Sequence, residues 1–387
     1  MPSAADRARA WIHTYTRDLS REDLERLFTD DTKDAYSFFA RGIDEDELSG
    51  MSAWKRAAMR FRQVFVAFTL KLPAARRAVY FVALGIGLIG LIQLYQGFTP
   101  VVVPFGLPFF HVTMMLPTWA GGTFALIISL VLVNLLVLLE VAERLSLKGE
   151  LEIAREIQLA LLPRGTHSTH DIEISGFTKP ANTVGGDFYD VLPQPDGRIV
   201  LTLGDVAGKG SPAALLMALL LAAFRTLVEE RLDPSALVAR LNVQICRHSP
   251  ASRFITLVYT VYDPVTGRLT YVNAGQNPPL IRRRDGTFER LGGTGIALGL
   301  FEHSEYATVE TSLEPGDMLV FYSDGITEAE NPEGQPLEES GLETVIQLYA
   351  HRSASELGTE VLAAVQAHAQ RARFADDLTI LVVKRQG

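Results

Sequence analysis

One long window of the chain, from Ala78 to Leu139, contains no charged side chain, and it constrains the fold more than any other feature. Asp, Glu, Lys and Arg make up 21% of the 387 residues, so their absence here is local. Residues 78–98 and 121–139 are almost entirely apolar, and each has roughly the 20 residues that an α-helix needs to cross a bilayer. The sequence therefore predicts a transmembrane hairpin over residues 78–139.

A helical hairpin buried in the core of a soluble domain is the alternative. Core helices rarely stay apolar on all faces over such a length, so the membrane hairpin is the stronger hypothesis. The segment between the two spans, residues 99–120, is apolar but contains Pro100, Pro104, Pro108 and Pro117. Because proline interrupts regular structure, we expect a turn there on the far side of the membrane.

The charges beside the hairpin predict its orientation. The connecting segment has no Lys or Arg, whereas the first span is preceded by Lys55, Arg56, Arg60, Arg62, Lys71, Arg76 and Arg77. By the positive-inside rule both chain ends lie in the cytoplasm, which predicts a multi-pass protein of the inner (cytoplasmic) membrane. Residues 55–77 are basic and apolar by turns and are expected to lie along the lipid bilayer as an amphipathic helix. Residues 1–54 contain no signal peptide and predict a small helical cytoplasmic segment.

The helical pattern continues after the second span through residues 140–163, where Pro163 ends it. Apolar side chains recur at spacings of three and four, at Leu147, Leu151, Ala154, Ile157 and Leu161. This linker is either a coiled-coil stalk that makes the chain a homodimer or a helix that lies on the next domain. The stalk is the preferred hypothesis, although the segment is short for a coiled coil and contains Gly149.

Residues 164–387 alternate short apolar runs with turns, which predicts an α+β domain with mainly antiparallel sheets. Three β-hairpins are expected, with turns at 195–197, 263–267 and 285–286. Further strands are expected at 305–312, 317–322 and 378–384, and helices at 212–230, 234–247, 338–350 and 355–373. The apolar run 213–224 has only 12 residues before Arg225, so it predicts a buried helix capped by Ser211 and not a third span.

Composition excludes several classes of function. The net charge of −9 argues against a nucleic-acid partner, because neutralising phosphates requires a basic surface. Cys246 is the only cysteine, which excludes a disulfide framework and a zinc site built from several thiolates. Any metal chemistry must therefore depend on carboxylates.

In four places an aspartate ends or interrupts an apolar strand, within residues 185–190 (GGDFYD), 204–210 (GDVAGKG), 322–325 (YSDG) and 376–379 (DDLT). Each alone is typical of a turn or a cap. Together they indicate carboxylates that converge at strand ends. Such a cluster repels itself unless a multivalent cation neutralises it, and a set of oxygen ligands favours Mg²⁺ or Mn²⁺ over Zn²⁺.

Spacing excludes two other motifs. Residues 204–211 differ from a P-loop because the framing glycines enclose three residues instead of four, and Gly210 stands where Ser or Thr must bind magnesium. Residues 324–331 are not an EF-hand loop, because Ile326 occupies the second ligand position.

Several motifs resemble the bacterial SpoIIE/RsbU-like branch of the PPM (protein phosphatase 2C-like) family of metal-dependent serine/threonine phosphatases. They are AREIQLALLP (154–163), GGDFYD (185–190), GDVAGKGSPAALLM (204–217), NAGQNPPLI (273–281), FYSDGITEAEN (321–331) and DDLTILVV (376–383). The resemblance covers about residues 150–387. It implies an α-β-β-α sandwich, with two packed antiparallel sheets flanked by helices, and a two-metal site at one edge.

The resemblance also assigns roles to residues. Two Mn²⁺ or Mg²⁺ ions would be bound by Asp187, Asp205, the backbone carbonyl of Val206, Asp324 and Asp376. Asp205 resembles the carboxylate that bridges both ions, while Asp377 and Gly186 lie at positions that support the ligands. Gln276 departs from the His that this branch often has after Asn-Ala-Gly.

By this resemblance the chain is a membrane-anchored phosphatase in which a water activated by two metal ions attacks phosphoserine or phosphothreonine. The substrate implied is a phosphorylated cytoplasmic regulator of the anti-anti-sigma type. The alternative is a catalytically inactive membrane adaptor that uses a phosphatase-like domain only to bind partners, and the intact set of aspartates argues against it. We further expect the packing of the second span and the stalk to set catalytic competence.

Overall fold

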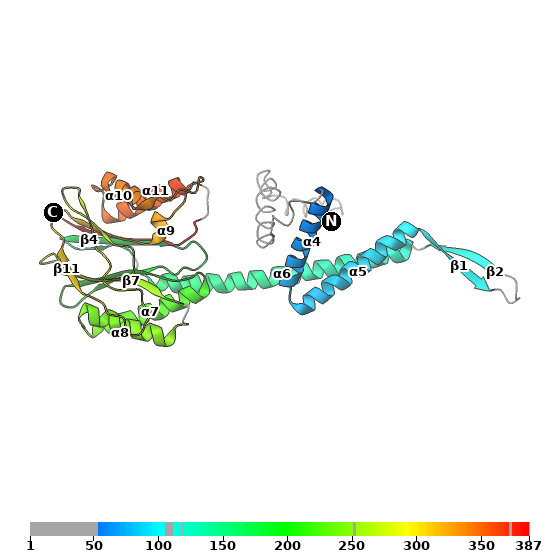
Figure 1. The fold of residues 1–387 in the computed structure, drawn as a ribbon, viewed down its shortest axis with the longest axis horizontal. Helices are drawn as coiled ribbons and strands as arrows, with labels where there is room; N and C mark the ends of the chain where they lie inside the picture. The colour runs from blue at the N-terminus through cyan, green and yellow to red at the C-terminus, as the bar shows by residue number, and fades with distance from the viewer. Residues whose placement is uncertain are drawn as a thin grey trace, which may run out of the picture. The chain divides into compact units, whose positions relative to one another are not determined.

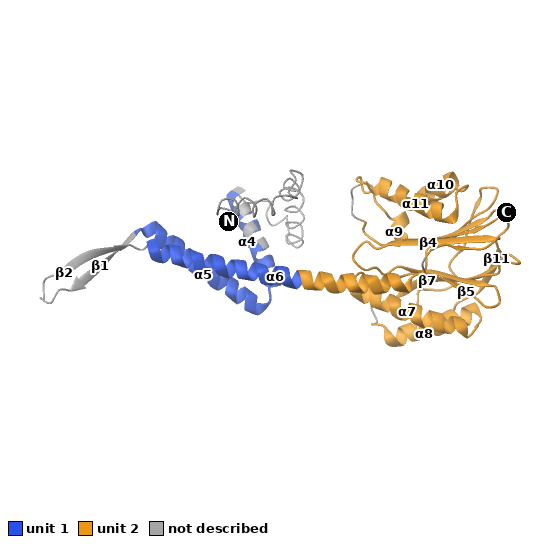
Figure 2. Cartoon of the chain, turned by 180° about the vertical axis from the view of Figure 1, so that it is seen from behind, with its two compact units in different colours: residues 1–144 blue, residues 145–387 orange. Residues whose placement is uncertain are grey.

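The computed structural model describes residues 53–104, 111–117, 119–163, 165–250, 253–370 and 374–386. The chain divides into two compact units, Met1–Arg144 and Leu145–Gly387, which Figure 2 colours separately. The predicted helical segment 1–54 lies outside the described residues except for Ala53 and Trp54.

The described part of the first unit contains helices α4 (Ala53–Lys71), α5 (Ala74–Gln96) and the first part of α6 (Trp119–Leu161). Helices α5 and α6 lie side by side, and the hydroxyl of Ser129 donates a hydrogen bond of 2.7 Å to the carbonyl of Ala83. Many of their large apolar side chains are more than half exposed, among them Leu88, Ile89, Leu91, Leu130 and Val131. By length and composition both helices can cross a membrane.

The segment between these helices differs from the predicted turn. It forms an antiparallel pair of strands, β1 (Phe98–Pro104) and β2 (His111–Pro117), with Phe98 opposite Pro117 and Pro104 opposite His111. The prolines do not prevent pairing, because Pro104 and Pro117 end their strands and Pro100 lies in a two-stranded ribbon whose strands each keep an open edge. The run Val101–Val103 favours the extended backbone.

The second unit contains two antiparallel sheets. The six-stranded sheet has the order β10-β9-β12-β13-β4-β3 and the five-stranded sheet the order β11-β8-β7-β6-β5. Their strands are β3 (His167–Ser168), β4 (Ile172–Lys179), β5 (Phe188–Pro193), β6 (Ile199–Val206), β7 (Ile255–Tyr262), β8 (Arg268–Ala274), β9 (Leu280–Arg282), β10 (Phe288–Arg290), β11 (Val309–Ser312), β12 (Met318–Tyr322) and β13 (Leu378–Arg385).

Helices cover the outer face of each sheet (Figure 1). Helices α7 (Ser211–Glu229) and α8 (Pro234–His248) pack on the five-stranded sheet. Helices α10 (Glu338–Leu348) and α11 (Ala354–Ala369) lie over the six-stranded sheet, where the short α9 (Asp324–Thr327) follows β12. The predicted α-β-β-α sandwich is therefore confirmed.

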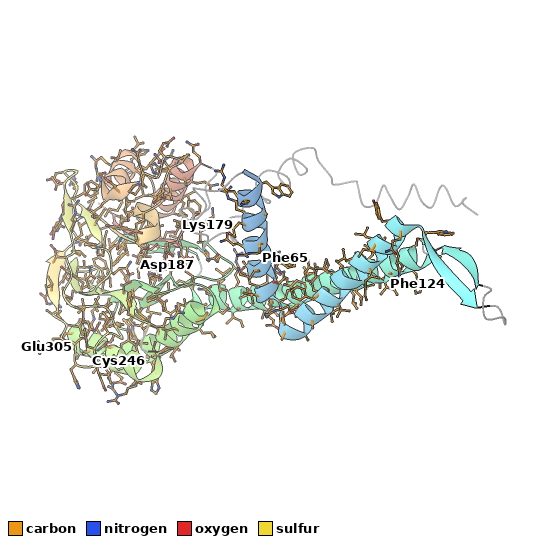
Figure 3. All side chains as sticks on the ribbon, turned by 45° about the vertical axis from the view of Figure 1, so that its right-hand side comes forward. Phe65, Phe124, Lys179, Asp187, Cys246 and Glu305 are labelled. Atoms are coloured by element: carbon orange, nitrogen blue, oxygen red, sulfur yellow. The ribbon has the colours of Figure 1, made fainter. Side chains whose placement is uncertain are left out.

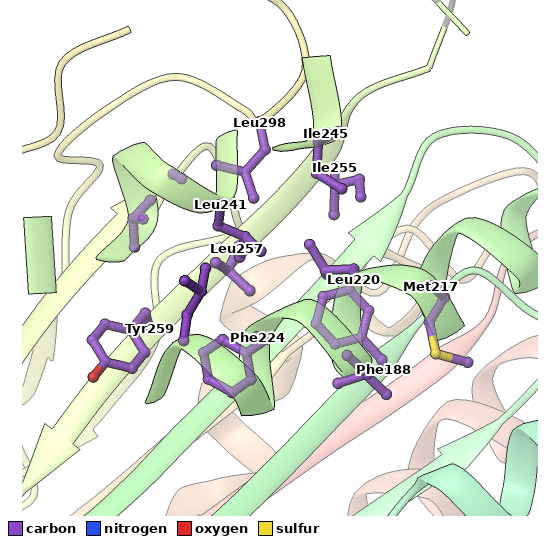
Figure 4. Close-up of a cluster of buried hydrophobic side chains, with 14 of the residues drawn as sticks. Phe188, Met217, Leu220, Phe224, Leu241, Ile245, Ile255, Leu257, Tyr259 and Leu298 are labelled. Carbon is purple, nitrogen blue, oxygen red and sulfur yellow. The ribbon is translucent and has the colours of Figure 1, made fainter. Parts of the chain in front are cut away.

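Three apolar clusters fill the three interfaces between these layers. The cluster beneath α7 and α8 is drawn in Figure 4, where Phe224 of α7 meets Tyr259 of β7 with ring centroids 5.7 Å apart. Helix α7 is apolar enough to resemble a membrane span, but Met217, Leu220 and Leu221 are fully buried in this cluster. Its buried face makes α7 a core helix, as its short apolar run predicts.

The three predicted hairpins are present as β5–β6, β7–β8 and β9–β10. The sequence did not predict β4, which pairs with β13, its partner about 200 positions later in the chain, as in Lys179 opposite Leu378. A strand of this kind has no local turn signal, because its neighbour comes from a distant part of the sequence.

One local prediction from the sequence is wrong. Ser211 does not cap α7: the N-cap is Gly210, whose φ of 77° takes it into the left-handed region where glycine is favoured.

The end of α6 packs into the sandwich. Leu162 is buried in the cluster beneath α7, and the guanidinium of Arg225 donates to the carbonyl of Leu161 at 2.6 Å. The same guanidinium forms an ion pair of 2.7 Å with the buried carboxylate of Asp190 on β5. Earlier in the helix, Leu147, Ile153 and Ile157 are more than half exposed. The last turn of α6 is thus part of the domain core.

We predict that Arg225→Met lowers the free energy of unfolding by about 3 kcal/mol, because it leaves the carboxylate of Asp190 buried without its partner. Urea unfolding followed by circular dichroism measures this loss. The double variant Asp190→Asn/Arg225→Met removes both charges and should be more stable than Arg225→Met alone. Equal stability of the single and double variants would contradict the assignment to this ion pair.

Candidate active site

The aspartates singled out from the sequence come together at one edge of the sandwich. Strand pairing explains the first two: Phe188 lies opposite Gly204, so Asp187 comes next to Asp205 where β5 begins and β6 nears its end. Asp324 begins α9 directly after β12, and Asp376 precedes the neighbouring strand β13. Both sheets therefore contribute carboxylates to the same edge.

Asp187, labelled in Figure 3, is the most deeply buried of these carboxylates, with 3% of its surface exposed. Burial and, next, the charge of Asp205 raise its pKa well above the usual value, while the hydroxyls of Thr379 and Ser323 act in the opposite direction. Among the described residues its Oδ2 atom has no hydrogen-bond partner. A buried carboxylate oxygen without a partner is costly and indicates a site for a positive ligand.

Asp205 is the second carboxylate whose pKa is strongly raised. Burial first, and then the charges of Asp324, Asp376 and Asp377, raise its pKa to about 7, against a hydrogen bond with Asp187 that lowers it. The carbonyl oxygen of Val206 lies at the same place: a Cβ atom added to Gly186 would stand 2.8 Å from that oxygen and 2.8 Å from Oδ1 of Asp205. A side chain at position 186 would therefore occupy the space toward which both oxygens turn.

Asp324 and Asp376 form the other half of the cluster. Burial, followed by the charges of Asp376 and Glu328, raises the pKa of Asp324. Asp376 is partly exposed and forms an ion pair of 3.0 Å with the ammonium of Lys209, which also donates to the carbonyl of Ala375. This hydrogen bond with Asp376 raises the pKa of Lys209. Lys209 thus supplies positive charge at the exposed side of the cluster.

Asp377 holds the loop that carries Asp187. Its carboxylate accepts hydrogen bonds from the backbone N–H groups of Ala181 and Gly186, each at 2.7 Å, and a longer one of 3.4 Å from that of Asp187. Asp377 therefore fixes the backbone of Gly186 and Asp187, the segment that carries the side chain of Asp187.

Gln158 contributes to the same loop, and the sequence analysis assigned it no role. Its side-chain amide is buried, donates to the carbonyl of Gly185 at 2.7 Å and accepts from the N–H of Gly185 at 3.1 Å. Ile157, one of the apolar residues at helical spacing, is 60% exposed, whereas Gln158 beside it is buried. The available signal was that Gln158 lies four residues after Ala154 and four before Leu162.

Gln276 connects the two sheets beside the cluster. Its Oε1 atom accepts a hydrogen bond from the hydroxyl of Thr256, which lies opposite Asp205 on β7, and its Nε2 atom donates to the carbonyl of Tyr322 at 3.3 Å. Tyr322 ends β12 two residues before Asp324. The glutamine in place of histidine therefore has a structural role between the two halves of the site.

This arrangement suits divalent cations in its donor chemistry. Only oxygen donors converge at this edge of the sandwich. Burial first, and then neighbouring carboxylates, raise the pKa values of Asp187, Asp205 and Asp324, and Oδ2 of Asp187 lacks a partner among the described residues. Within the described ranges, no three His, Cys, Asp or Glu side chains lie close enough to form a ligand set by themselves. Binding a cation would require the carboxylates to draw together, which its charge favours.

Comparisons with known proteins agree with this chemistry. Residues 195–386 match the family model described as Stage II sporulation protein E (SpoIIE), a range that contains Asp205, Asp324 and Asp376 but not Asp187. The phosphoserine phosphatase RsbU of Bacillus subtilis is 32% identical over 241 residues, which cover 62% of this chain and 71% of that protein. The phosphoserine phosphatase RsbP of the same organism is 28% identical over 189 residues, covering 47% of this chain and 46% of that protein.

Among solved structures, the fold is similar to the SiaA-PP2C domain of Pseudomonas aeruginosa, with a TM-score of 0.57 and 23% identity. The match covers 64% of this chain and 99% of that domain. At this level of identity the likeness establishes the fold of the second unit.

We predict that the free energy of unfolding in the presence of a chelator falls between about pH 5 and about pH 8. The pKa of Asp205 is raised to about 7 in the folded chain, so the folded state keeps a proton that the unfolded state releases near pH 4. Stability present at the acid end is therefore lost as the pH rises through about 7. Urea unfolding at a series of pH values measures this free energy of unfolding.

Asp205→Asn removes this titration and should reduce the pH dependence, leaving the contribution of Asp187, whose pKa burial also raises. Asp263→Asn is the matched control: the side chain of Asp263 is exposed in a turn and its pKa is lowered by a hydrogen bond from Thr266, so it does not titrate in this range. A free energy of unfolding that rises over the same pH interval would contradict the prediction.

Proposed function

Because the chain belongs to the SpoIIE family of PP2C-type serine/threonine phosphatases, we propose that it hydrolyses phosphoserine or phosphothreonine on a cytoplasmic regulatory protein while anchored in the membrane. The observation that supports this site most directly is the convergence of Asp187, Asp205, Asp324 and Asp376. Burial first, and then the charges of Asp324 and Asp376, raise the pKa of Asp205 to about 7. Carboxylates crowded in this way favour the binding of cations, and PP2C-type chemistry uses cations.

The proposed cofactors are two Mn²⁺ or Mg²⁺ ions bound by Asp187, Asp205, the carbonyl of Val206, Asp324 and Asp376. When bound, such ions supply Lewis acidity that activates water for attack on phosphorus and offsets charge on the phosphoryl oxygens. Asp205 lies between the two halves of the cluster, next to Asp187 and within the field of Asp324 and Asp376, which suits the bridging role. No covalent intermediate with the protein is required.

The remaining residues of the site position these ligands. Asp377 and Gln158 hold the backbone of residues 185–187 from opposite sides through the hydrogen bonds described above. Lys209, half exposed beside Asp376, would lie near the dianionic phosphoryl group of a substrate and attract it by charge. The chain thereby orients an anionic substrate at a site whose own carboxylates are neutralised.

The substrate proposed is a phosphorylated anti-anti-sigma-type regulator. Two relatives, RsbU and RsbP, are named phosphoserine phosphatases, which supports phosphoserine as the group that is hydrolysed. The same names argue against the inactive-adaptor alternative.

The anchor proposed is the hairpin of residues 78–139, with both chain ends in the cytoplasm. Helices α5 and α6 are long and apolar enough to span a bilayer, and their exposed apolar side chains would face lipid. We further propose that α6 forms a homodimer through its exposed apolar residues, with Leu147, Ile153 and Ile157 available for such contacts. Through Gln158, the packing of this helix would influence the loop of Asp187.

We predict that Asp205→Asn lowers hydrolysis of a phosphoserine protein in excess Mn²⁺ by at least about 100-fold, because it removes the central charge of the site. Phosphate release from the full chain measures it, with circular dichroism to establish that the fold is kept. Asp263→Asn, an exposed turn variant, is the control and should keep full activity. Retained turnover in Asp205→Asn would refute the two-metal assignment, and absent Mn²⁺ binding in calorimetry would favour the adaptor.

A second prediction concerns the anchor and the stalk. The full chain should float with lipid vesicles, and residues 145–387 should not, because they lack the hairpin. A chain that starts near Arg164, and so lacks the stalk as well, should differ in specific activity from the full chain by at least about fivefold if helix packing controls the site. Equal activities would remove the support for control by the stalk, and a full chain that stays behind in the flotation assay would refute the anchor.

A further inference from the structure

The first unit contains a cavity of about 450 Å³ that the phosphatase function does not use. Its walls come from the end of α4, the start of α5 and residues Val133–Arg144 of α6. All of these residues belong to one compact unit. The cavity therefore forms where the amphipathic segment turns into the first proposed span.

One side of the cavity is apolar. Phe68 and Tyr80 meet edge to face, with ring centroids 5.9 Å apart, and they stand opposite the aliphatic side chains of α6. These aliphatic residues are Val133, Leu136 and Val137, all within the charge-free window of the sequence. A hydrocarbon chain would replace water against this surface favourably.

The rim of the cavity is cationic. Lys71, Arg76 and Arg144 line it together with one acid, Glu140. Arg76 contacts Glu140 at 3.0 Å and Glu143 at 2.6 Å, and Arg144 contacts Glu140 at 3.2 Å. Among the described residues, the rim has three cations and, with Glu143 included, two acids, and the ion pairs orient the guanidinium groups.

These two surfaces meet where the sequence changes from apolar to charged. The first proposed span is preceded by Arg76 and Arg77, and the second is followed by Glu140 and Arg144. In a membrane hairpin this is the level of the cytoplasmic headgroups, where basic pockets between helices bind anionic lipids. The matching ligand has a phosphate at the rim and an acyl chain along the apolar wall.

We propose that this cavity binds one anionic phospholipid of the cytoplasmic leaflet, its phosphate near Arg76 and Arg144 and an acyl chain against Phe68, Tyr80 and Val137. The inference rests on the proposed membrane anchor and is independent of phosphatase activity. A lipid in this position would join the amphipathic segment to the start of α6.

The test uses the full chain purified with equal amounts of phosphatidylglycerol and phosphatidylcholine, with bound lipid counted by native mass spectrometry. We expect the unmodified chain to retain phosphatidylglycerol. The variant Arg76→Gln/Arg144→Gln should retain at least about tenfold less of this lipid. Lys55→Gln/Arg62→Gln removes the same charge from exposed positions outside the cavity and should behave as the unmodified chain.

A second variant covers the case that loss of the Arg76 ion pairs disturbs the helices. Val137→Phe fills the apolar wall without changing any charge and should also reduce phosphatidylglycerol retention severalfold. Unchanged retention in both variants, or equal retention of phosphatidylcholine by the unmodified chain, would overturn the inference. Asp205→Asn, which tests the phosphatase, should retain lipid fully, so the two proposals fail separately.

Discussion

Repulsion between buried carboxylates is the constraint on which the second unit depends. Asp187 and Asp205 are neighbours because Phe188 pairs with Gly204, and Asp324 and Asp376 add their charges from the other sheet. Burial alone would favour protonated side chains, and crowding makes ionisation harder still. The fold opposes this repulsion with two sheets, three apolar clusters and a set of hydrogen bonds around the loop of Asp187.

Those hydrogen bonds connect the site to α6. Asp377 holds the N–H of Gly186 from one side, and Gln158 of α6 holds both backbone groups of Gly185 from the other. One turn further, Arg225 joins the carbonyl of Leu161, the last residue of α6, to the buried Asp190, three residues after Asp187. A displacement of this end of α6 therefore acts directly on the segment that carries a proposed ligand, which gives the proposed control by the linker a physical route.

The first unit poses a different problem, because most of its apolar surface has no protein partner among the described residues. A bilayer is the solvent that suits such a surface, and the arginines at the ends of the two apolar helices suit the headgroups. The cavity beside Arg76 follows from the same change of composition, since one side of it borders apolar sequence and the other borders charge. The proposed anchor and the proposed lipid site thus depend on one feature of the sequence, whereas the candidate active site depends on the fold of the second unit.

The sequence alone predicted the features that depend on local composition or on periodic spacing. The charge-free window predicted α5 and the first part of α6, turn residues predicted β5–β6, β7–β8 and β9–β10, and family motifs pointed to the sandwich and to the aspartates. These features arise from neighbouring residues, so a single stretch of chain is enough to reveal them.

Long-range contacts had to come from the tertiary structure. The position of β4 depends on its pairing with β13. The burial of Gln158 depends on its hydrogen bonds to Gly185. The bridge made by Gln276 depends on Thr256 and Tyr322, which come from different sheets. The β1–β2 ribbon is likewise defined by its pairing, because the prolines in this segment predicted a turn and not two strands. Each of these depends on which distant backbone groups come within hydrogen-bonding distance, and only the packed chain decides that.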